Sequence, residues 1–405
     1  MSAQTEAVVQ TSKGQTRASL TVLFATVFVD LLGFGIVIPF LPMYAERLGV
    51  NTAGIGLILS IYSLMQFVAA PILGRISDQV GRRPVIMLGL LGSSLSYFIY
   101  GFANSFPVLL LSRGVHGICA GTVSTAQAYV ADTTSARERA HGMGLIGAAF
   151  GLGFVLGPGI GGILGRSDLR VPVFFAAAIT LLNLLFAALR LPESHPPSGT
   201  RRLALRELAE PLRILPRQLT RHRMARLFLI AFLATFAMAM FETTFAIMAP
   251  AVYRSSAVEV GYLLAYAGLV QAVTQGYLLR KVVKRIDETR LIRAGMILFA
   301  IGMTPMASFH RHAVLLLWLA LLSLGYGLAN PSIASLISRR TGQHLQGEVL
   351  GINQSAMAVA RIIGPLVAGV FYGATGPTWA YAAGGGVALA AFLIARGVSN
   401  GPSGG

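Results

Sequence analysis

Four charged side chains stand well inside long apolar stretches of this chain, where ordinary surface charge does not explain them. They are Asp30, Arg113, Glu242 and Arg361. An ionised group at such depth in a membrane costs about 3 kcal/mol on insertion scales unless a partner or water compensates it. Each of the four therefore needs a partner or a watery cavity, and each is a candidate functional residue.

The two carboxyl groups are candidates for carrying protons. Asp30 lies about ten residues into an apolar stretch, which at about 1.5 Å per residue is near the middle of a membrane-spanning helix. Glu242 stands among Met238, Phe241 and Phe245, surroundings compatible with a protonated carboxyl. A carboxyl whose surroundings change with access to the two sides of a membrane is what proton coupling requires. A static ion pair is the alternative interpretation of Asp30.

The basic residues are expected to act on these carboxyls. We expect Arg113 to orient a carboxylate or tune its proton affinity, and Arg361 could pair with Glu242 across helices. His116, three residues after Arg113, could titrate near neutral pH. A hydrogen-bonded histidine with a packing role is the favoured interpretation of His116.

Uncharged polar and aromatic residues in the same stretches could line a cavity. Gln66 and Gln271 coincide when the second half of the chain is shifted by 205 positions, and Tyr62 lies one turn from Gln66. Bonding between helices is the alternative for the glutamines, and packing is the alternative for the aromatics. The expected cavity set comprises Gln66, Gln271, Tyr62, Phe34, Phe245, Arg361 and Asn330.

The elements that must position these residues are membrane-spanning helices. Hydrophobic residues make up 55% of the chain and charged residues 12%, whereas soluble domains carry about a quarter charged residues. In lipid the backbone must satisfy its own hydrogen bonds, so apolar stretches of roughly 20 residues are helices. Twelve spans are predicted, at 20–42, 55–74, 84–103, 106–131, 142–165, 172–191, 227–249, 259–280, 291–309, 313–338, 348–370 and 377–397.

The net charge of +17 follows from orientation in a membrane. Most lysines and arginines lie between alternate spans, on the side that also carries both termini, so the positive-inside rule places the termini in the cytoplasm. No basic stripe is interleaved with aromatics, which excludes nucleic acid as a partner. The apolar stretch from Leu20 is followed by further spans and is a transmembrane helix, not a cleaved signal peptide. Cys119 is the only cysteine, so no intrachain disulfide is possible.

One long loop divides the chain into two bundles of six spans. The expected division is a tail at 1–18, a first bundle at 19–191, a central loop at 192–226, a second bundle at 227–397 and a tail at 398–405. The basic loop could contain an amphipathic helix at the cytoplasmic surface or be a solvated tether.

The two bundles resemble each other in sequence. A shift of 205 places Gly56 on Gly261, and a shift of 207 places Gly144, Gly157, Pro158 and Gly162 on Gly351, Gly364, Pro365 and Gly369. A repeat of six spans implies a pseudo-twofold axis along the membrane normal and a binding site between the halves.

A charged loop between spans 2 and 3 is a candidate gate. It contains Gly74, Asp78, Gly81, Arg82 and Arg83. The glycines permit a tight turn, Asp78 can accept bonds from arginine or a helix N-terminus, and the arginines can anchor to phospholipid. A latch that breaks during conformational change and a simple topological anchor are equally compatible with this pattern.

Span 5 carries a second dense pattern, of small residues. Gly153, Gly157, Pro158, Gly161 and Gly162 predict a thin, kinked helix that packs closely against a neighbour. Loss of one backbone hydrogen bond at the proline is tolerated inside a bundle.

These patterns resemble the signatures of the major facilitator superfamily. The loop is similar to G-x-x-x-D-R/K-x-G-R-R/K, with Gln79 where a base is usual, and span 5 matches the antiporter signature G-x-x-x-G-P-x-x-G-G. Arg113 and Gly117 are similar to the R-x-x-x-G element of span 4. The combination resembles the twelve-helix drug:proton antiporter branch, especially tetracycline and quinolone efflux pumps, and is densest over residues 20–165.

The resemblance implies a monomeric bacterial inner-membrane protein that exports drugs or other small amphipathic compounds in exchange for protons, with antibiotic resistance as the outcome. It implies that span 5 seals the outer side. An acid that tetracycline pumps carry in span 3 is replaced by Ser96, and Asn330 stands near an acid of some quinolone pumps. Transport of a metabolite such as a sugar, and a sensor or scaffold that does not transport, remain alternatives.

Enzymatic and ATP-driven functions find no support in the sequence. No G-x-x-x-x-G-K-[ST] phosphate loop and no H-E-x-x-H ligand pattern occurs, and both are motifs on which such chemistry commonly depends. We therefore predict no cofactor and no metal, with the proton gradient as the driving force. The expected partners are a small-molecule substrate, protons and membrane lipid.

Overall fold

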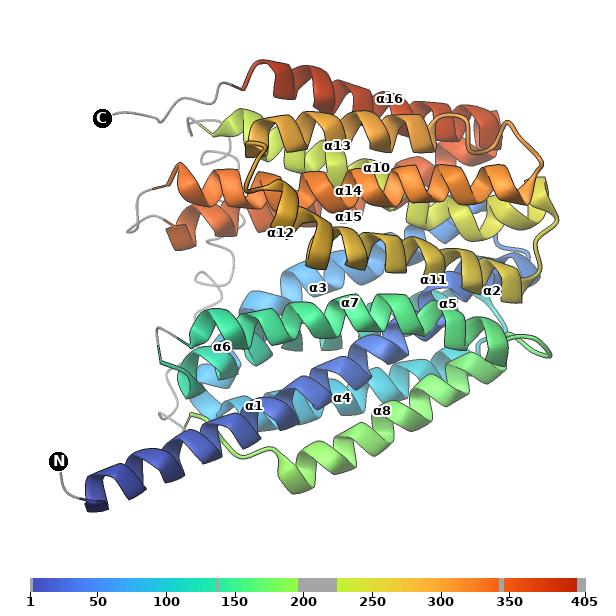
Figure 1. The fold of residues 1–405 in the computed structure, drawn as a ribbon. Coiled ribbons are helices and arrows are strands. Elements are labelled where there is room, and N and C mark those ends of the chain that lie inside the picture. Colours follow the sequence, from blue (N-terminus) through green and yellow to red (C-terminus); the bar gives the residue numbers. More distant parts are fainter. Residues whose placement is uncertain (1–2, 136–137, 196–223, 342–345, 399–405) are drawn as a thin grey trace.

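The structure is an all-helical bundle (Figure 1). This computed structural model describes residues 3–135, 138–195, 224–341 and 346–398. Within these ranges 11 helices or joined helices are long and apolar enough to cross a membrane, and the 16-residue α13 is the twelfth span. The predicted all-α architecture of twelve spans is confirmed.

The first six spans form one half of the bundle. Their elements are α1 (Ala3–Val37) continued by η1 (Ile38–Phe40) and α2 (Leu41–Arg47), α3 (Thr52–Val80), α4 (Arg82–Gly101), α5 (Phe106–Ala120) with α6 (Thr122–Thr133), α7 (Arg139–Leu164) and α8 (Arg170–Arg190).

The last six spans form the other half. Their elements are α10 (Ala225–Tyr253), α11 (Ala257–Val273) continued by the π-helical η2 (Thr274–Leu278) and by α12 (Leu279–Val282), α13 (Glu288–Met303), α14 (His312–Arg339), α15 (Gln346–Thr375) and α16 (Pro377–Arg396). Residues 196–223 of the expected central loop, and with them its possible amphipathic helix, lie outside the described residues.

Capping side chains set several helix starts that hydropathy alone misplaces. α11 begins two residues before the predicted span because Ser256 and Glu259 form a reciprocal capping box. α13 begins three residues early because the Asp287 side chain accepts a hydrogen bond from the Arg290 amide at 2.9 Å. Both signals are local and present in the sequence.

α1 begins and α16 ends on the same side of the bundle, at left in Figure 1. We call this the terminus side and the opposite side the distal side. Odd-numbered spans run from the terminus side to the distal side and even-numbered spans run back.

The buried apolar residues form two clusters with different membership. The larger cluster contains residues of both halves, including Ile36 and Phe40 at the distal end of the first span together with Phe228 and Phe241. The smaller cluster, which includes Leu23, belongs to the first half alone and lies toward the terminus side. The halves therefore share a core on the distal side but not on the terminus side.

Candidate functional site

Helix α7 is attached to α1 by glycines four residues apart. A Cβ atom added to Gly157 would lie 2.5 Å from the carbonyl carbon of Gly35, and one added to Gly153 would lie 3.0 Å from the carbonyl oxygen of Leu31. Gly161 continues the same face toward α1. A Cβ atom does not fit at Gly157 or Gly161 and would displace the neighbour at Gly153. Three of the five residues of the span 5 pattern therefore join helices within the first half. The helix runs unbroken through Pro158.

The remaining residues of the pattern face the second half. A Cβ atom added to Gly261 on α11 would lie 2.5 Å from the carbonyl oxygen of Pro158, and one added to Gly162 would lie 3.0 Å from the carbonyl oxygen of Val258. These positions are at the distal ends of α7 and α11. Backbone therefore packs on backbone across the two halves on the distal side.

The pseudo-equivalent helix α15 makes the same two kinds of contact. A Cβ atom on Gly364 would lie 2.8 Å from Cβ of Ala239 on α10, within the second half. A Cβ atom on Gly369 would lie 3.2 Å from Cα of Ala53 on α3, across the halves, and one on Gly56 would overlap the Pro365 carbonyl oxygen. The residues that coincide in the sequence repeat thus occupy equivalent places in the structure.

Glycines toward the terminus side face open space instead. Among the described residues, a Cβ built on Gly144, Gly147 or Gly151 of α7, or on Gly351 of α15, would meet no atom of another helix within 4 Å. We call the tight distal contact between the halves the distal seam. The two halves are closed at this seam and separated on the terminus side.

Asp30 lies at mid-depth on α1. Ser93 on α4 is the polar neighbour of the Asp30 carboxylate. The Oδ1 atom of Asp30 is buried and has no hydrogen-bond partner among the described residues. Among the described residues, no lysine or arginine nitrogen lies within 4.0 Å of Asp30. In this state Asp30 therefore does not form the static ion pair that was the alternative interpretation.

Arg113 is 1% exposed and is surrounded by tyrosine rings. Its guanidinium carbon lies 5.0 Å from the ring centre of Tyr100 and 5.7 Å from that of Tyr97. Its Nε and Nη2 atoms have no acceptor within the described part of the chain. Cation–π contact compensates this charge in part, and the carboxylate that Arg113 was expected to orient is not in contact with it in this state.

His116 packs among aromatic rings of three helices. Its ring centre lies 4.6 Å from that of Tyr97, 5.3 Å from Tyr62 and 6.0 Å from Phe34. Its Nδ1 atom is buried and has no partner in the described ranges. The packing role favoured from the sequence is compatible with this geometry, and the expected hydrogen bond is absent from it.

Tyr97 and Tyr100 were not predicted as site residues. They continue a polar stripe that runs from Ser93 through Ser96 along α4, at the spacing of one helix face. This periodicity is the signal that could have identified them. Ser96 itself is fully buried and donates to the Ser93 carbonyl oxygen at 2.7 Å.

Glu242 is exposed although residues 241 and 243–249 around it on α10 are buried. Helices of both halves surround α10, so the open space at Glu242 lies inside the bundle. Arg361 on α15 is half-buried and acts electrostatically on Glu242, on Tyr326 of α14 and on Tyr62 of α3. Over the described residues, no ion pair of 4.0 Å or less joins Glu242 to Arg361.

The other expected cavity residues divide into two groups. Gln66 is half-buried and donates to the Ala120 carbonyl oxygen on α5 at 3.4 Å, the interhelical bond that was its alternative role. Gln271 and Asn330 are half-buried, and within the described ranges neither side chain makes such a bond. Phe245 is fully buried against Phe241, with ring centres 5.0 Å apart. Its placement in the cavity needs correction for this state, because one turn beyond Glu242 the bundle is already closed.

The charged loop is folded around Arg82, which is 6% exposed. Its Nη1 and Nε atoms pair with Asp78 at 2.5 Å and with Asp132 of α6 at 2.9 Å. The Glu193 carboxylate accepts from the Arg82 and Arg83 amides at 2.8 and 3.2 Å. Gly81 adopts a φ of 102° at the turn. Arg82 therefore binds protein groups where phospholipid contact was expected.

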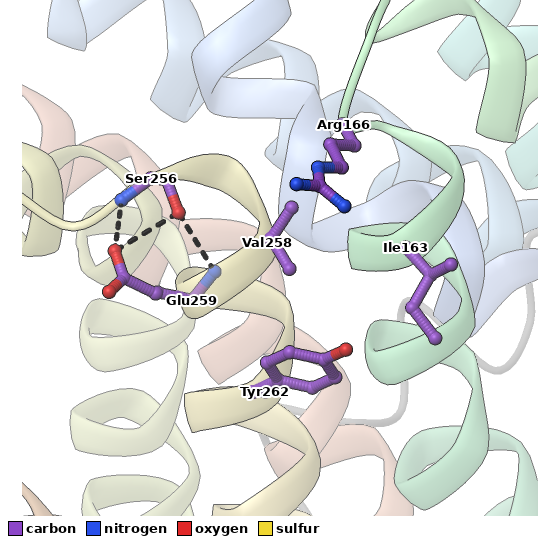
Figure 2. Close-up of a pocket in the computed structure, with 6 residues that line it drawn as sticks. All are labelled: Ile163, Arg166, Ser256, Val258, Glu259 and Tyr262. Carbon is purple, nitrogen blue, oxygen red and sulfur yellow. Dashed lines mark hydrogen bonds between the residues drawn. The ribbon is translucent and has the colours of Figure 1, made fainter.

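A surface pocket of about 320 Å³ lies at the distal end of the seam (Figure 2). Ile163 and Arg166 line it from the first half, and Val258, Glu259 and Tyr262 from the second. Glu259 is already engaged there, accepting from the Ser256 amide at 2.7 Å. The pocket is at the distal surface, at a different depth from Asp30 and Glu242, so it is not the site that these carboxyls serve.

The family follows from comparison of the whole chain with known proteins. The sequence profile of the Major Facilitator Superfamily matches residues 23–349 and 227–403. The chain belongs to this superfamily.

Relatives within the superfamily match over most of their length. The tetracycline resistance protein, class C, of Escherichia coli is 33% identical over 365 residues, covering 89% of this chain and 91% of that protein. The quinolone resistance protein NorA of Staphylococcus aureus is 27% identical over 358 residues, covering 87% and 89%. The predicted relationship to tetracycline and quinolone resistance proteins is confirmed.

A solved relative has the same fold. The human organic anion transporter MFSD10 (TETRAN) superposes with a TM-score of 0.69 at 30% identity, covering 94% of this chain and 99% of that structure. The protein is thus a multi-pass membrane secondary transporter with a small-molecule substrate, and it is not an enzyme. Among the described residues no cluster of three or more potential ligands could hold a metal ion.

Proposed function

We propose that this transporter exports small amphipathic compounds from the cytoplasm in exchange for protons, by alternating access. The observation that carries the proposal is the pair of mid-depth carboxyls, Asp30 and Glu242. Neither has a basic partner within 4.0 Å among the described residues. Both lie between the closed distal seam and the open terminus side.

A carboxyl without a cation partner is the group that a proton can neutralise at this depth. Protonation of Asp30 or Glu242 removes a charge that would otherwise need water, so it favours the orientation in which that residue is enclosed. Release of the proton to the other side resets the cycle. Arg113, held by tyrosine rings, is available to attract one of these carboxylates in another state.

The proposed orientation places the terminus side in the cytoplasm of a bacterium, at its inner membrane. Basic residues concentrate between spans on that side, as the positive-inside rule requires. The structure is then the state open to the cytoplasm, and the distal seam is the outer gate. The proposal includes the bundles at 19–191 and 227–397, the loop at 192–226, tails at 1–18 and 398–405, and a monomeric unit.

The amphipathic nature of the substrate is supported by the walls of the site. Phe34 and Tyr62 are half-buried aromatics with ring centres 5.2 Å apart, beside the unpaired charges. The names of the relatives, tetracycline resistance protein and quinolone resistance protein, support a drug-like cargo. Ser96, in the span where tetracycline pumps carry an acid, does not support a metal-chelated drug.

Everted membrane vesicles with an imposed pH gradient test this function. We expect an amphipathic fluorescent dye such as ethidium to accumulate inside them, and an uncoupler to abolish the accumulation. Asp30→Asn and Glu242→Gln keep the shape of each side chain but remove its titrating group. Each should lower gradient-driven accumulation at least about tenfold, a loss of about 1.4 kcal/mol of coupling, while downhill exchange persists.

Asp168→Asn is the matched control, because Asp168 is an exposed carboxyl between α7 and α8. It should accumulate dye like the unmodified protein. Equilibration of dye without dependence on the gradient would overturn the antiport proposal, and dye binding without any flux would indicate a sensor.

A further inference from the structure

Glu242 and Arg361 carry opposite charges in the second half of the bundle and do not pair. Glu242 is exposed inside the bundle and Arg361 is half-buried. Opposite charges at membrane depth normally compensate each other directly, because an unpaired one costs several kcal/mol. A gap between them needs water or a ligand to fill it.

The packing of α10 on α15 sets the size of this gap. The two helices run in the same direction and touch where a Cβ on Gly364 would lie 2.8 Å from Cβ of Ala239. Arg361 is three residues before this contact and Glu242 is three residues after Ala239. At about 1.5 Å per residue, the two positions are offset by about 9 Å along the helix axes. The register therefore places the two side chains at different levels along the helix axes, and in this structure no ion pair of 4.0 Å or less joins them among the described residues.

Aromatic residues of both halves lie near Arg361. Tyr326 of α14 and Tyr62 of α3 lie within electrostatic range of Arg361. Tyr62 stacks in a tilted arrangement on Phe34, 5.2 Å away. A ligand here would contact the first half through these rings and the second half through both charges.

These features select the charge pattern of the ligand. A purely cationic ligand at Glu242 would be repelled by the neighbouring guanidinium, and a purely anionic ligand at Arg361 would be repelled by the carboxylate. A ligand that carries an anionic and a cationic group on one aromatic scaffold compensates both charges. A guanidinium is suited to the anionic part because it binds carboxylates with two parallel hydrogen bonds.

We propose that the space between Arg361 on α15 and Glu242 on α10 is a binding site for zwitterionic aromatic compounds. Arg361 holds the anionic group, Glu242 holds the cationic group, and the rings of Tyr62 and Phe34 pack on the scaffold. This deepens the proposed export function by naming its substrate class, and it rests on that function. Binding, however, can be measured without transport.

Equilibrium binding of three xanthene dyes to the full-length protein in lipid nanodiscs tests the site. The dyes are the zwitterionic rhodamine with a free benzoate, its methyl ester, which is a cation, and fluorescein, an anion. Fluorescence anisotropy is recorded at one pH with no gradient. We expect the zwitterion to bind about tenfold more tightly than the ester, the effect of one charge-assisted contact.

Substitutions assign the two ends of the ligand. Arg361→Gln should lower the affinity for the zwitterion to that for the ester. The affinity for the ester should stay the same or rise. Glu242→Gln should lower the affinity for the zwitterion and for the ester but not the affinity for fluorescein. Arg361→Lys keeps the charge and should keep the preference for the zwitterion, which distinguishes a lost contact from a misfolded protein. Arg311→Gln, an exposed arginine at the distal end of α14, is the matched control.

The results separate this inference from the transport proposal. The inference is overturned if the ester binds as tightly as the zwitterion, if Arg361→Gln weakens both equally, or if the zwitterion does not bind at millimolar concentration. Gradient-driven uptake of the same dyes reports on export independently. Selective binding without uptake would reject the export function alone, and uptake without selectivity would reject the zwitterion site alone.

Discussion

Arg82 is a cation at the end of a membrane span, and its ion-pair partners are carboxylates of the protein itself. It is 6% exposed and joins the end of α3 to the end of α6 through Asp78 and Asp132. A charge enclosed to this extent depends on its partners, because their loss leaves it, or them, uncompensated. The exposed pair of Arg290 with Asp287, at 3.1 Å, offers a comparison, since the Arg290 side chain is 73% exposed.

We predict that Arg82→Gln lowers the stability of the detergent-solubilised protein by about 1–3 kcal/mol, because two carboxylates lose a charged donor. The thermal unfolding midpoint should fall by several degrees. Arg290→Gln should change it little, because an exposed ion pair contributes about 0–1 kcal/mol. Equal shifts of the unfolding midpoint for the two variants would show that the burial of Arg82 does not increase its contribution to stability.

Single residues differ in how far the sequence alone revealed them. Asp30, Glu242, Arg113 and Arg361 were recognisable because a charge in an apolar stretch is conspicuous whatever the fold. Tyr97 was missed because a tyrosine in such a stretch is unremarkable until a guanidinium is placed on its ring. These roles depend on contacts between helices that no local pattern encodes.

At the scale of elements, α7 and α15 are helices with two contact faces. On one face α7 uses Gly153, Gly157 and Gly161, and α15 uses Gly364, to contact a helix of its own half. On another face each uses a proline and a glycine four residues later to close the distal seam. The small residues were visible in the sequence. Their division between two neighbours was not, because it depends on which helices flank α7 and α15 in space.

We predict that Gly56→Val prevents closure of the distal seam, because the added side chain overlaps the Pro365 carbonyl oxygen. Transport should fall at least about tenfold, the effect of destabilising the closed state by about 1.4 kcal/mol or more. A cysteine at Ala53, which Gly369 covers, should react faster with a membrane-impermeant maleimide.

Gly386→Val is the control for this substitution, since in the described part of the chain a Cβ at Gly386 would meet no atom of another helix within 4 Å. It should leave both labelling and transport unchanged. Unaltered labelling of the cysteine in Gly56→Val would contradict the assignment of the seam. Labelling is measured in a protein whose native Cys119 is replaced by alanine.

At the scale of the whole molecule, the two halves meet on one side only. Their shared apolar cluster includes the distal end of the first span, whereas the first half keeps a separate cluster toward the terminus side. Alternating access requires that the distal contacts break and that contacts on the terminus side form. Fixing the distal seam should therefore stop transport without affecting the fold.

We predict that cysteines at Thr52 and Gly373 form a disulfide that locks the seam. A Cβ at Gly373 lies 3.9 Å from Cβ of Thr52, within the range of about 3.5–4.5 Å that a disulfide needs. In the Cys119→Ala background, oxidation should abolish transport and dithiothreitol should restore it. Each single cysteine should transport under both conditions. Full activity of the oxidised pair would show that the seam does not open during the cycle.

The sequence by itself determined that this chain is a bundle of twelve helices in two related halves, because a continuous apolar stretch of about 20 residues satisfies its backbone hydrogen bonds in lipid as a helix. It also identified the charges that such a bundle must accommodate. Only the tertiary structure decided which side is closed, that tyrosine rings surround Arg113, and that Glu242 and Arg361 stand apart. Those outcomes depend on the register of helices far apart in the chain, because an offset of a few residues decides whether two opposite charges meet.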